Sequence, residues 1–151
     1  MKLVIVSGYF NPLHGGHLDN IEGARKLGDK LLAIVNNDHA QMLKKGKIIL
    51  DEQNRVRLIR ALRDVDEVFL SVDDDLGQSK SLRKIRELYP DDELIFAKGG
   101  DRDPTNHALP DNELQSINDC HIEVVYGVGS HDVEKRDSST RINQATGHET
   151  A

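Results

Sequence analysis

The sequence predicts an α/β fold, namely a Rossmann-like, doubly wound, five-stranded parallel sheet with helices on both faces. Short apolar segments rich in β-branched residues alternate along the chain with segments whose apolar residues recur at helical spacing. The first apolar segment, residues 2–6, has no polar residue after Lys2, which is typical of a strand buried on both faces. Strands that alternate with helices form a parallel sheet joined by right-handed crossovers, with helices on each face.

Each expected element follows from this alternation. The expected strands are residues 2–6, 30–37, 67–72, 93–100 and 122–128. The expected helices are residues 17–28, 39–47, 51–65, 79–90 and 111–119. Gly28 and Gly46 are typical of helix C-termini, and Pro90 stops a helix. Asp51 and Glu52 favour the start of one, because acidic side chains stabilise the first turn.

The composition is that of a soluble globular domain, with 37% hydrophobic and 30% charged residues among 151. A net charge of −6 argues against general affinity for nucleic acid, and no apolar run suits a membrane span or a signal peptide. The one cysteine, Cys120, cannot form an internal disulfide, so a cytoplasmic location is expected. One domain is expected at residues 1–143, followed by a polar tail at 144–151.

The most informative segment lies between the first strand and the first helix. The turn from Ser7 to Gly16 is rich in glycine, which lets a backbone approach a ligand closely. The helix that follows presents free N–H groups to an anion. His14 and His17 are three residues apart, so both imidazoles can face the same point. The segment therefore predicts a phosphate site with two imidazoles.

Two other interpretations of this histidine pair stay open. A His-x-x-His pair can arise by chance, and such pairs are more often solvated or structural than catalytic. A zinc site is the second interpretation, although Cys120 lies in a different segment and no Cys/His cluster accompanies the pair.

Ligands of doubly wound sheets bind outside the carboxyl ends of the strands. Beyond the histidine segment, the residues expected there are 36–38, 71–75, 98–101 and 127–140. At residues 98–101 we favour contacts with a base and ribose over a plain tight turn. The acidic run at 73–75 is interpreted as a solvated loop.

Two segments near the ends of the chain resemble the signatures of one family. GYFNPLHGGH, residues 8–17, resembles the G-x-F-[DN]-x-x-H-x-G-H signature of the cytidylyltransferase-like nucleotidyltransferases. SSTRI, residues 138–142, stands where that superfamily has its second signature. Between them, VNNDHAQMLKKG, NRVRLIRALRDVDEV and FAKGGDR match the family in order. The similarity is greatest to the branch of heptose-phosphate adenylyltransferase and glycerol-3-phosphate cytidylyltransferase.

The resemblance implies the chemistry of the site. In this family a phosphate oxygen of the acceptor attacks the α-phosphorus of a nucleoside triphosphate, and pyrophosphate leaves. The implied catalytic residues are His14, His17 and Lys45. The histidines donate to triphosphate oxygens, and the lysine neutralises the α-phosphate. Lys44 is the alternative to Lys45, and both could instead belong to a solvated basic run.

The resemblance also implies two sets of binding residues. The nucleotide-binding set is Gly8, Tyr9, Phe10, Gly16, Lys98, Gly100, Asp101, Ser138, Ser139 and Thr140. The substrate-binding set is Asn11, Asn36, Lys44, Arg55 and Arg136. Two alternatives stay open: the Ser-Ser-Thr run could simply cap a helix, and Arg55 could be one of several exposed helix charges. No metal ligands from the protein are implied, Mg²⁺ is expected as the counter-ion of the triphosphate, and a homodimer is expected.

The predicted function is transfer of a nucleotidyl group from ATP or CTP to a sugar or polyol phosphate. ATP is favoured, because FAKGGDR resembles the heptose adenylyltransferase at this turn. The acceptor is less well defined, because Asn11 replaces the aspartate of most sugar-phosphate members and the loop after Gly46 looks about two residues shorter than in the heptose enzyme. The alternatives are an adenylyltransferase for nicotinamide mononucleotide or phosphopantetheine, and a nucleotide-binding module without catalysis.

Overall fold

A computed structural model describes residues 1–99 and 109–129 of the chain. Within this part, five strands form one sheet in the order β3-β2-β1-β4-β5, and every neighbouring pair is parallel. The strands are β1 (Lys2–Gly8), β2 (Lys30–Val35), β3 (Glu67–Leu70), β4 (Glu93–Gly99) and β5 (Ile122–Val128). The predicted Rossmann-like parallel sheet is therefore confirmed.

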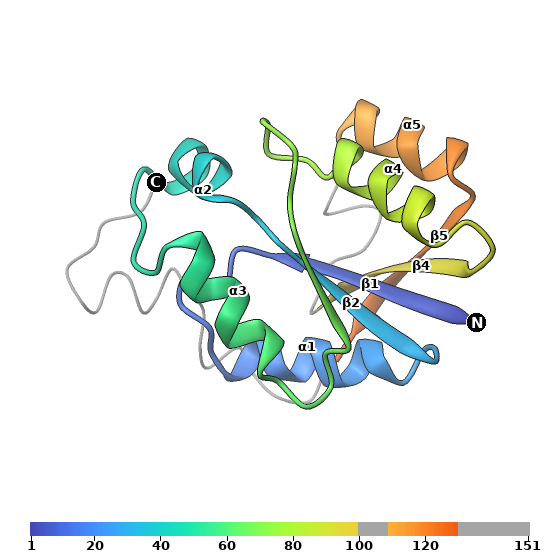
Figure 1. The fold of residues 1–151 in the computed structure, drawn as a ribbon, viewed down its shortest axis with the longest axis horizontal. Coiled ribbons are helices and arrows are strands. Elements are labelled where there is room, and N and C mark those ends of the chain that lie inside the picture. Colours follow the sequence, from blue (N-terminus) through green and yellow to red (C-terminus); the bar gives the residue numbers. More distant parts are fainter. Residues whose placement is uncertain (100–108, 130–151) are drawn as a thin grey trace.

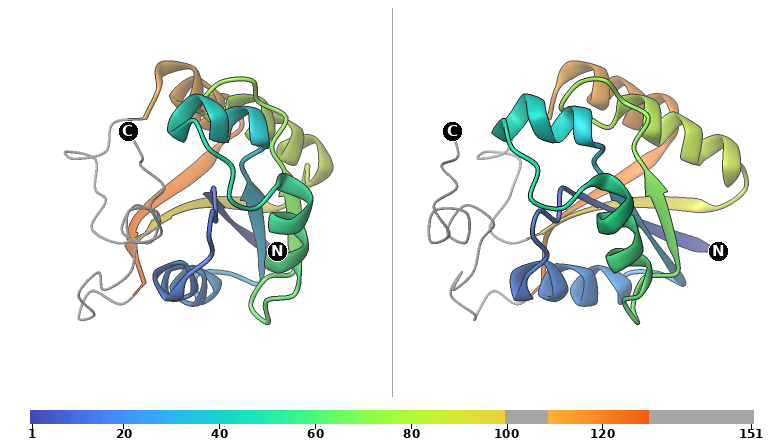
Figure 2. Two further views of the ribbon diagram at one scale, coloured as in Figure 1. Left: turned by 90° about the vertical axis from the view of Figure 1, so that its left-hand side faces the viewer. Right: turned by 60° about the vertical axis from the view of Figure 1, so that its left-hand side comes forward.

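The helices cover both faces of this sheet, as predicted. They are α1 (Gly15–Arg25), α2 (Asp38–Lys45), α3 (Glu52–Arg60), α4 (Ser79–Leu88) and α5 (Asp111–Asp119). Figure 1 and Figure 2 show α1 and α3 on one face of the sheet, and α4 and α5 on the other. The chain runs from β2 into α2 beyond the carboxyl edge of the sheet, so α2 lies near the strand ends rather than on a face (Figure 1).

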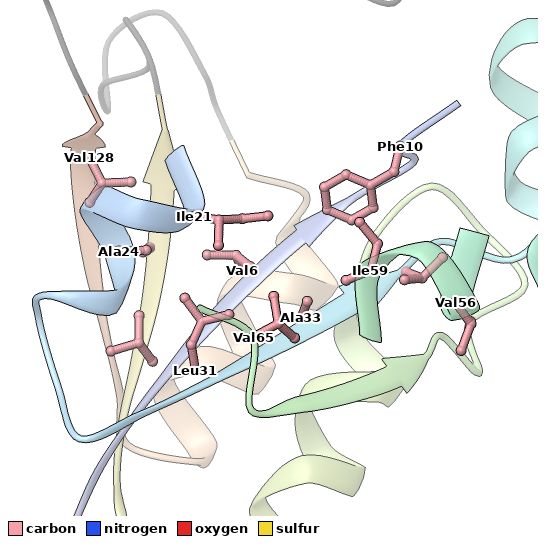
Figure 3. Packing of buried hydrophobic residues seen from close by; sticks show 13 residues of the cluster. Val6, Phe10, Ile21, Ala24, Leu31, Ala33, Val56, Ile59, Val65 and Val128 are labelled. Carbon is pink, nitrogen blue, oxygen red and sulfur yellow. The ribbon is translucent and has the colours of Figure 1, made fainter. Parts of the chain in front are cut away.

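Two apolar clusters, one on each face, hold these layers together. The cluster beneath α1 and α3 includes Val4, Val6, Ile21, Ala24, Val56 and Ile59 (Figure 3). The cluster beneath α4 and α5 includes Leu3, Ile5, Leu82, Ile85, Phe96 and Ile117. Successive residues of β1 thus enter opposite clusters, which is the two-residue period of a strand buried on both faces.

Element boundaries differ from the prediction where local hydrogen bonds decide them. α1 begins at Gly15, before the predicted start at His17, because the side chain of His14 caps it. α2 ends at Lys45 with Gly46 in the left-handed region (φ 71°), so the predicted helix end at Gly46 is confirmed. α3 ends at Arg60, and the chain continues in tighter turns whose N–H groups bond three residues back.

Several predicted residues lie outside the described part of the chain. These are Gly100, Asp101, Arg136, Ser138, Ser139 and Thr140, together with the predicted tail at 144–151. Among the described residues, no helix is long and apolar enough to cross a membrane.

Candidate functional site

The candidate site lies at the carboxyl edge of the sheet, where the strand order reverses. β1 has β2 as its neighbour on one side and β4 on the other, which makes its carboxyl end a topological switch point. The turn after β1 leads directly into the N-terminus of α1, where backbone N–H groups point away from the helix. The edge therefore offers an anion both a helix terminus and the side chains of the turn.

The two signature histidines form a reciprocal cap at the start of α1. The N–H of Gly16 donates to Nδ1 of His14 at 3.1 Å, and the N–H of His14 donates to Nδ1 of His17 at 3.2 Å. Their rings stack with centroids 3.9 Å apart and planes 29° apart. The structure therefore brings His14 and His17 together, as the spacing predicted, and gives both a structural role as well.

This cap decides where each ring carries its proton. A nitrogen that accepts a hydrogen bond holds no proton, so each neutral imidazole has its hydrogen on Nε2. Both His14 and His17 therefore offer an Nε2–H donor on the side of the ring opposite the cap. Two such donors at a helix N-terminus can stabilise negative charge on phosphate oxygens.

Packing around His17 explains two further residues of the signature. The Phe10 ring meets His17 edge to face, with centroids 5.0 Å apart. A Cβ at Gly8 would lie 2.8 Å from the same Phe10 ring, so this position needs glycine for packing. By contrast, a Cβ at Gly15 would meet nothing within 4 Å, so space is open beside the helix start. The nucleotide contacts predicted for Gly8, Phe10 and Gly16 stay predictions.

The structure also brings α2 to the histidine turn. The ammonium of Lys44 lies 4.7 Å from the centroid of the Tyr9 ring, a cation–π contact that links the last turn of α2 to the signature. Lys45 is half-buried beside it. Burial raises the pKa of Tyr9 and the charge of Arg55 opposes this rise, so the Tyr9 hydroxyl keeps its proton at neutral pH. The choice between Lys44 and Lys45 as the catalytic lysine stays open.

Arg55 is not the exposed helix charge that one alternative predicted, because its side chain is completely buried. Nη1 donates to the carbonyl oxygens of Tyr9 (2.8 Å) and Asn36 (2.5 Å), and Nε donates to that of Leu50 (2.8 Å). Nη2 forms a salt bridge of 2.7 Å with the carboxylate of Asp38. Four of its five N–H groups therefore donate to oxygens of the described residues, and the acceptor contact of Arg55 stays a prediction.

Asn11 is buried as well, and its carboxamide faces the protein backbone. Oδ1 accepts hydrogen bonds from the N–H groups of Ile49 at 3.0 Å and Leu50 at 2.8 Å. A carboxylate could accept the same two bonds, which explains why asparagine can stand where most sugar-phosphate relatives have aspartate.

A second group of buried polar side chains surrounds the end of β4. The ammonium of Lys98 lies 4.0 Å from the centroid of the Phe96 ring. The backbone N–H of Gln78 donates to the carboxylate of Glu113 at 2.9 Å, and its side-chain amide donates to Oδ1 of Asn36. Burial raises the pKa of Glu113, although the charge of Lys98 opposes this rise.

Sequence reasoning did not identify Gln41, Gln78 and Glu113 as part of this edge. Each is a buried polar residue that lies on a helix or next to its start. The only available signal was helical spacing, since Glu113 precedes the buried Ser116 and Ile117 by three and four residues.

The predicted solvated loop at 73–75 is wrong for Asp73. Its carboxylate accepts hydrogen bonds from the N–H of Lys80 at 2.7 Å and from the N–H and hydroxyl of Ser81. Asp73 is therefore buried against the first turn of α4, whose N–H groups it accepts from, whereas Asp74 and Asp75 are exposed.

The described residues contain no group of three or more His, Cys, Asp or Glu side chains that could hold a metal ion. The histidine turn offers N–H donors and the end of α2 adds two lysines, and such groups suit phosphate oxygens better than a cation. Magnesium bound through the triphosphate stays a prediction.

Comparison with known proteins gives the same family as the motifs. The family described as cytidylyltransferase-like matches residues 5–145. The bifunctional protein HldE of Histophilus somni is 38% identical over 105 residues, which cover 68% of this chain but only 20% of HldE. The FAD synthase of Archaeoglobus profundus is 37% identical over 102 residues, 68% of this chain and 60% of that protein.

A solved structure extends the comparison along nearly the whole of a relative. The lipopolysaccharide core biosynthesis protein from Thermoplasma volcanium is 32% identical, with a TM-score of 0.60 over 86% of this chain and 97% of that chain. The HldE similarity agrees with the heptose-phosphate adenylyltransferase branch named from the motifs. On the strength of the matched family, the two capped histidines and the parallel sheet, the chain belongs to the cytidylyltransferase-like family.

Proposed function

We propose that this chain transfers a nucleotidyl group, by preference adenylyl, from a nucleoside triphosphate to a sugar or polyol phosphate. An oxygen of the acceptor phosphate forms a bond to the α-phosphorus, the bond from that phosphorus to the bridging oxygen breaks, and pyrophosphate leaves. Little covalent work falls to the protein, so catalysis consists of positioning and charge stabilisation.

The observation that carries this proposal is the histidine cap at the switch point. Both imidazoles accept through Nδ1, so His14 and His17 would donate through Nε2 to phosphate oxygens as negative charge builds up. The backbone N–H groups at the start of α1 would also stabilise this negative charge. The lysine at the end of α2, Lys44 or Lys45, would neutralise the α-phosphate and the acceptor phosphate.

The sugar-phosphate acceptor is supported by the HldE relatives and by the KGGD turn, of which the structure describes Lys98 and Gly99. A second candidate is an adenylyltransferase for a nucleotide-cofactor precursor, which the similarity to an FAD synthase favours. Magnesium would enter with the triphosphate. A homodimer and a cytoplasmic location remain part of the proposal, as expectations from sequence.

Pyrophosphate release tests the function directly. The chain would be assayed with ATP or CTP against a panel of acceptors: sugar phosphates, glycerol 3-phosphate, nicotinamide mononucleotide, phosphopantetheine and a flavin nucleotide. Release with a sugar or polyol phosphate is the expected result. Release only with a cofactor precursor would establish the second candidate, and no release with any acceptor would favour a binding module.

Replacement of the second histidine tests the site. His17→Ala should lower kcat by about 100-fold, on the order of 3 kcal/mol, because one donor to the developing charge is lost. The exposed His121 on the far side of the fold supplies the control, since His121→Ala should leave kcat unchanged. Normal turnover by both His14→Ala and His17→Ala would exclude this site.

The nucleotide preference is tested by calorimetric titration with ATP and CTP in the presence of magnesium. Bases are distinguished by a few buried polar groups at the strand ends, where an unpaired group is costly. ATP should bind more tightly. Tenfold tighter binding of CTP, about 1.4 kcal/mol, would reverse the preference and leave the transferase proposal intact.

A further inference from the structure

We propose that Arg55 is a positioning residue: with Asn11 and Gln41 it fixes the loop at residues 46–51 against the histidine turn. The lysines of α2 then stand at the site before any substrate binds. The catalytic meaning of this arrangement rests on the proposed function, but the arrangement itself can be measured without activity.

The backbone of the loop is held by side chains from three different elements. Nε2 of Gln41, from α2, donates to the carbonyl of Lys47 at 3.1 Å. Asn11 accepts from the N–H groups of Ile49 and Leu50, and Nε of Arg55 donates to the Leu50 carbonyl. The three side chains are at most 2% exposed. A loop with this many buried partners is held in one conformation.

The other end of the Arg55 guanidinium reaches the site itself. Nη1 joins the carbonyl of Tyr9, in the histidine turn, to that of Asn36, just after β2. The planar guanidinium of arginine can donate to all three carbonyl oxygens at once, whereas a lysine ammonium is a single point charge. Arg55 therefore ties three separate segments of the carboxyl edge to one another.

α2 is held at both of its ends as a result. At its start, Asp38 pairs with Arg55 and its N–H donates to the Glu52 carboxylate at 2.9 Å. At its end, the fixed loop follows Gly46. The last turn carries Lys44 and Lys45, and Lys44 already lies over Tyr9. A charge that is placed beforehand stabilises a transition state without the cost of reorganisation.

A direct role in acceptor binding fits these contacts less well. The guanidinium is completely buried, and four of its five N–H groups donate to oxygens of the described residues, so two or more bonds to a phosphate would leave carbonyl oxygens or Asp38 unpaired. Buried groups left unpaired in this way are strongly unfavourable. The two roles also differ in kinetics, because loss of an acceptor contact raises the acceptor KM, whereas misplaced lysines lower kcat.

The first experiment compares Arg55→Lys with the matched control Arg57→Lys, an exposed arginine on the same helix. Arg55→Lys should lower kcat at least tenfold and change the acceptor KM less than threefold, and Arg57→Lys should change neither. A tenfold rise in acceptor KM at unchanged kcat would overturn the positioning role and make Arg55 an acceptor ligand.

The second experiment needs no substrate. Hydrogen exchange of the Ile49 and Leu50 amides, followed by NMR, should be at least tenfold faster in Asn11→Ala and in Arg55→Lys than in the unaltered chain. Asn11→Asp keeps both acceptor bonds and should preserve slow exchange. If Arg55→Lys does not fold, the comparison of amide exchange in Asn11→Ala and Asn11→Asp tests the proposal.

The outcomes separate the two proposals. Protected amides in an inactive unaltered chain would overturn the proposed function and leave the fixed loop established. Unchanged exchange in Asn11→Ala would overturn the fixed loop, whatever the activity of the chain.

Discussion

Two buried polar centres lie at the carboxyl edge of the sheet, and they are built differently. Around Arg55, one cation is surrounded by three backbone carbonyl oxygens and a single carboxylate. Around the end of β4, Lys98 and Glu113 are side chains of opposite charge, buried within electrostatic reach of one another. The first centre connects backbone segments through one cation, whereas the second pairs two charged side chains, one of which also accepts from the Gln78 N–H.

This difference in composition indicates which of the two centres changes its charge with pH. Backbone carbonyl oxygens carry no titratable proton, so three of the four oxygens that Arg55 binds are the same at every pH. Burial raises the pKa of Glu113, so the charge of the second centre changes with pH. We therefore expect a fixed anchor on the β2 side of the site and an adjustable one on the β4 side.

The largest effect on stability should come from removal of the anchor. Arg55→Met leaves three carbonyl oxygens without their donor and the half-buried Asp38 without its cation, and it should lower the free energy of unfolding by roughly 3 kcal/mol. Urea denaturation measures this change. Arg57→Met, on the exposed side of α3, should stay within about 0.5 kcal/mol of the unaltered chain. Equal losses in the free energy of unfolding for Arg55→Met and Arg57→Met would show that the buried contacts of Arg55 do not stabilise the fold.

Removal of Lys98 should have an intermediate effect. At pH 7, Lys98→Met leaves Glu113 buried without the opposing cation, and we expect a loss of about 2 kcal/mol. The loss is smaller than at Arg55 because Glu113 can take up a proton. Near pH 4.5 the effect of Lys98→Met should shrink; an effect that does not vary with pH would show that the two groups are not coupled.

The smallest effect should come from Glu113→Gln, which keeps the hydrogen bond to the Gln78 N–H and removes the charge. With its pKa raised, Glu113 keeps a proton in the folded chain that the unfolded chain loses as pH rises above 4.5. The free energy of unfolding that Glu113 contributes therefore falls as pH rises above 4.5. Glu113→Gln should remove this slope and lie within about 1 kcal/mol at pH 7. Denaturation from pH 4.5 to 7, with Glu123→Gln as the exposed control, measures the slope.

The sequence predicted the sheet and the proximity of the two histidines because both depend on local patterns. A continuous apolar run marks β1, and the spacing of His14 and His17 already brings their rings together. Arg55 was harder, because Arg57 and Arg60 lie beside it in the sequence. Its position four residues before the buried Ile59 was the available signal that it shares the apolar face.

The buried acids show what a local pattern leaves out. Asp73 lies in a run of three aspartates, which is typical of a solvated loop. Its burial depends on the N-terminus of α4, whose N–H groups need an acceptor once the helix has packed on the sheet. Glu113 depends in the same way on Gln78 and Lys98, which come from other segments. Such contacts are tertiary, and no spacing within one segment encodes them.

The histidine cap has a consequence for selection. Asn, Asp and Ser are the residues that start helices best, and histidine is not among them. A chain selected only for thermal stability would therefore replace His14 and keep the same acceptor at the start of α1. Under the proposed function that replacement removes a donor to the triphosphate, so the start of α1 is a place where stability and activity compete. Thermostable variants that keep His14 would show that activity, and not the fold, maintains histidine there.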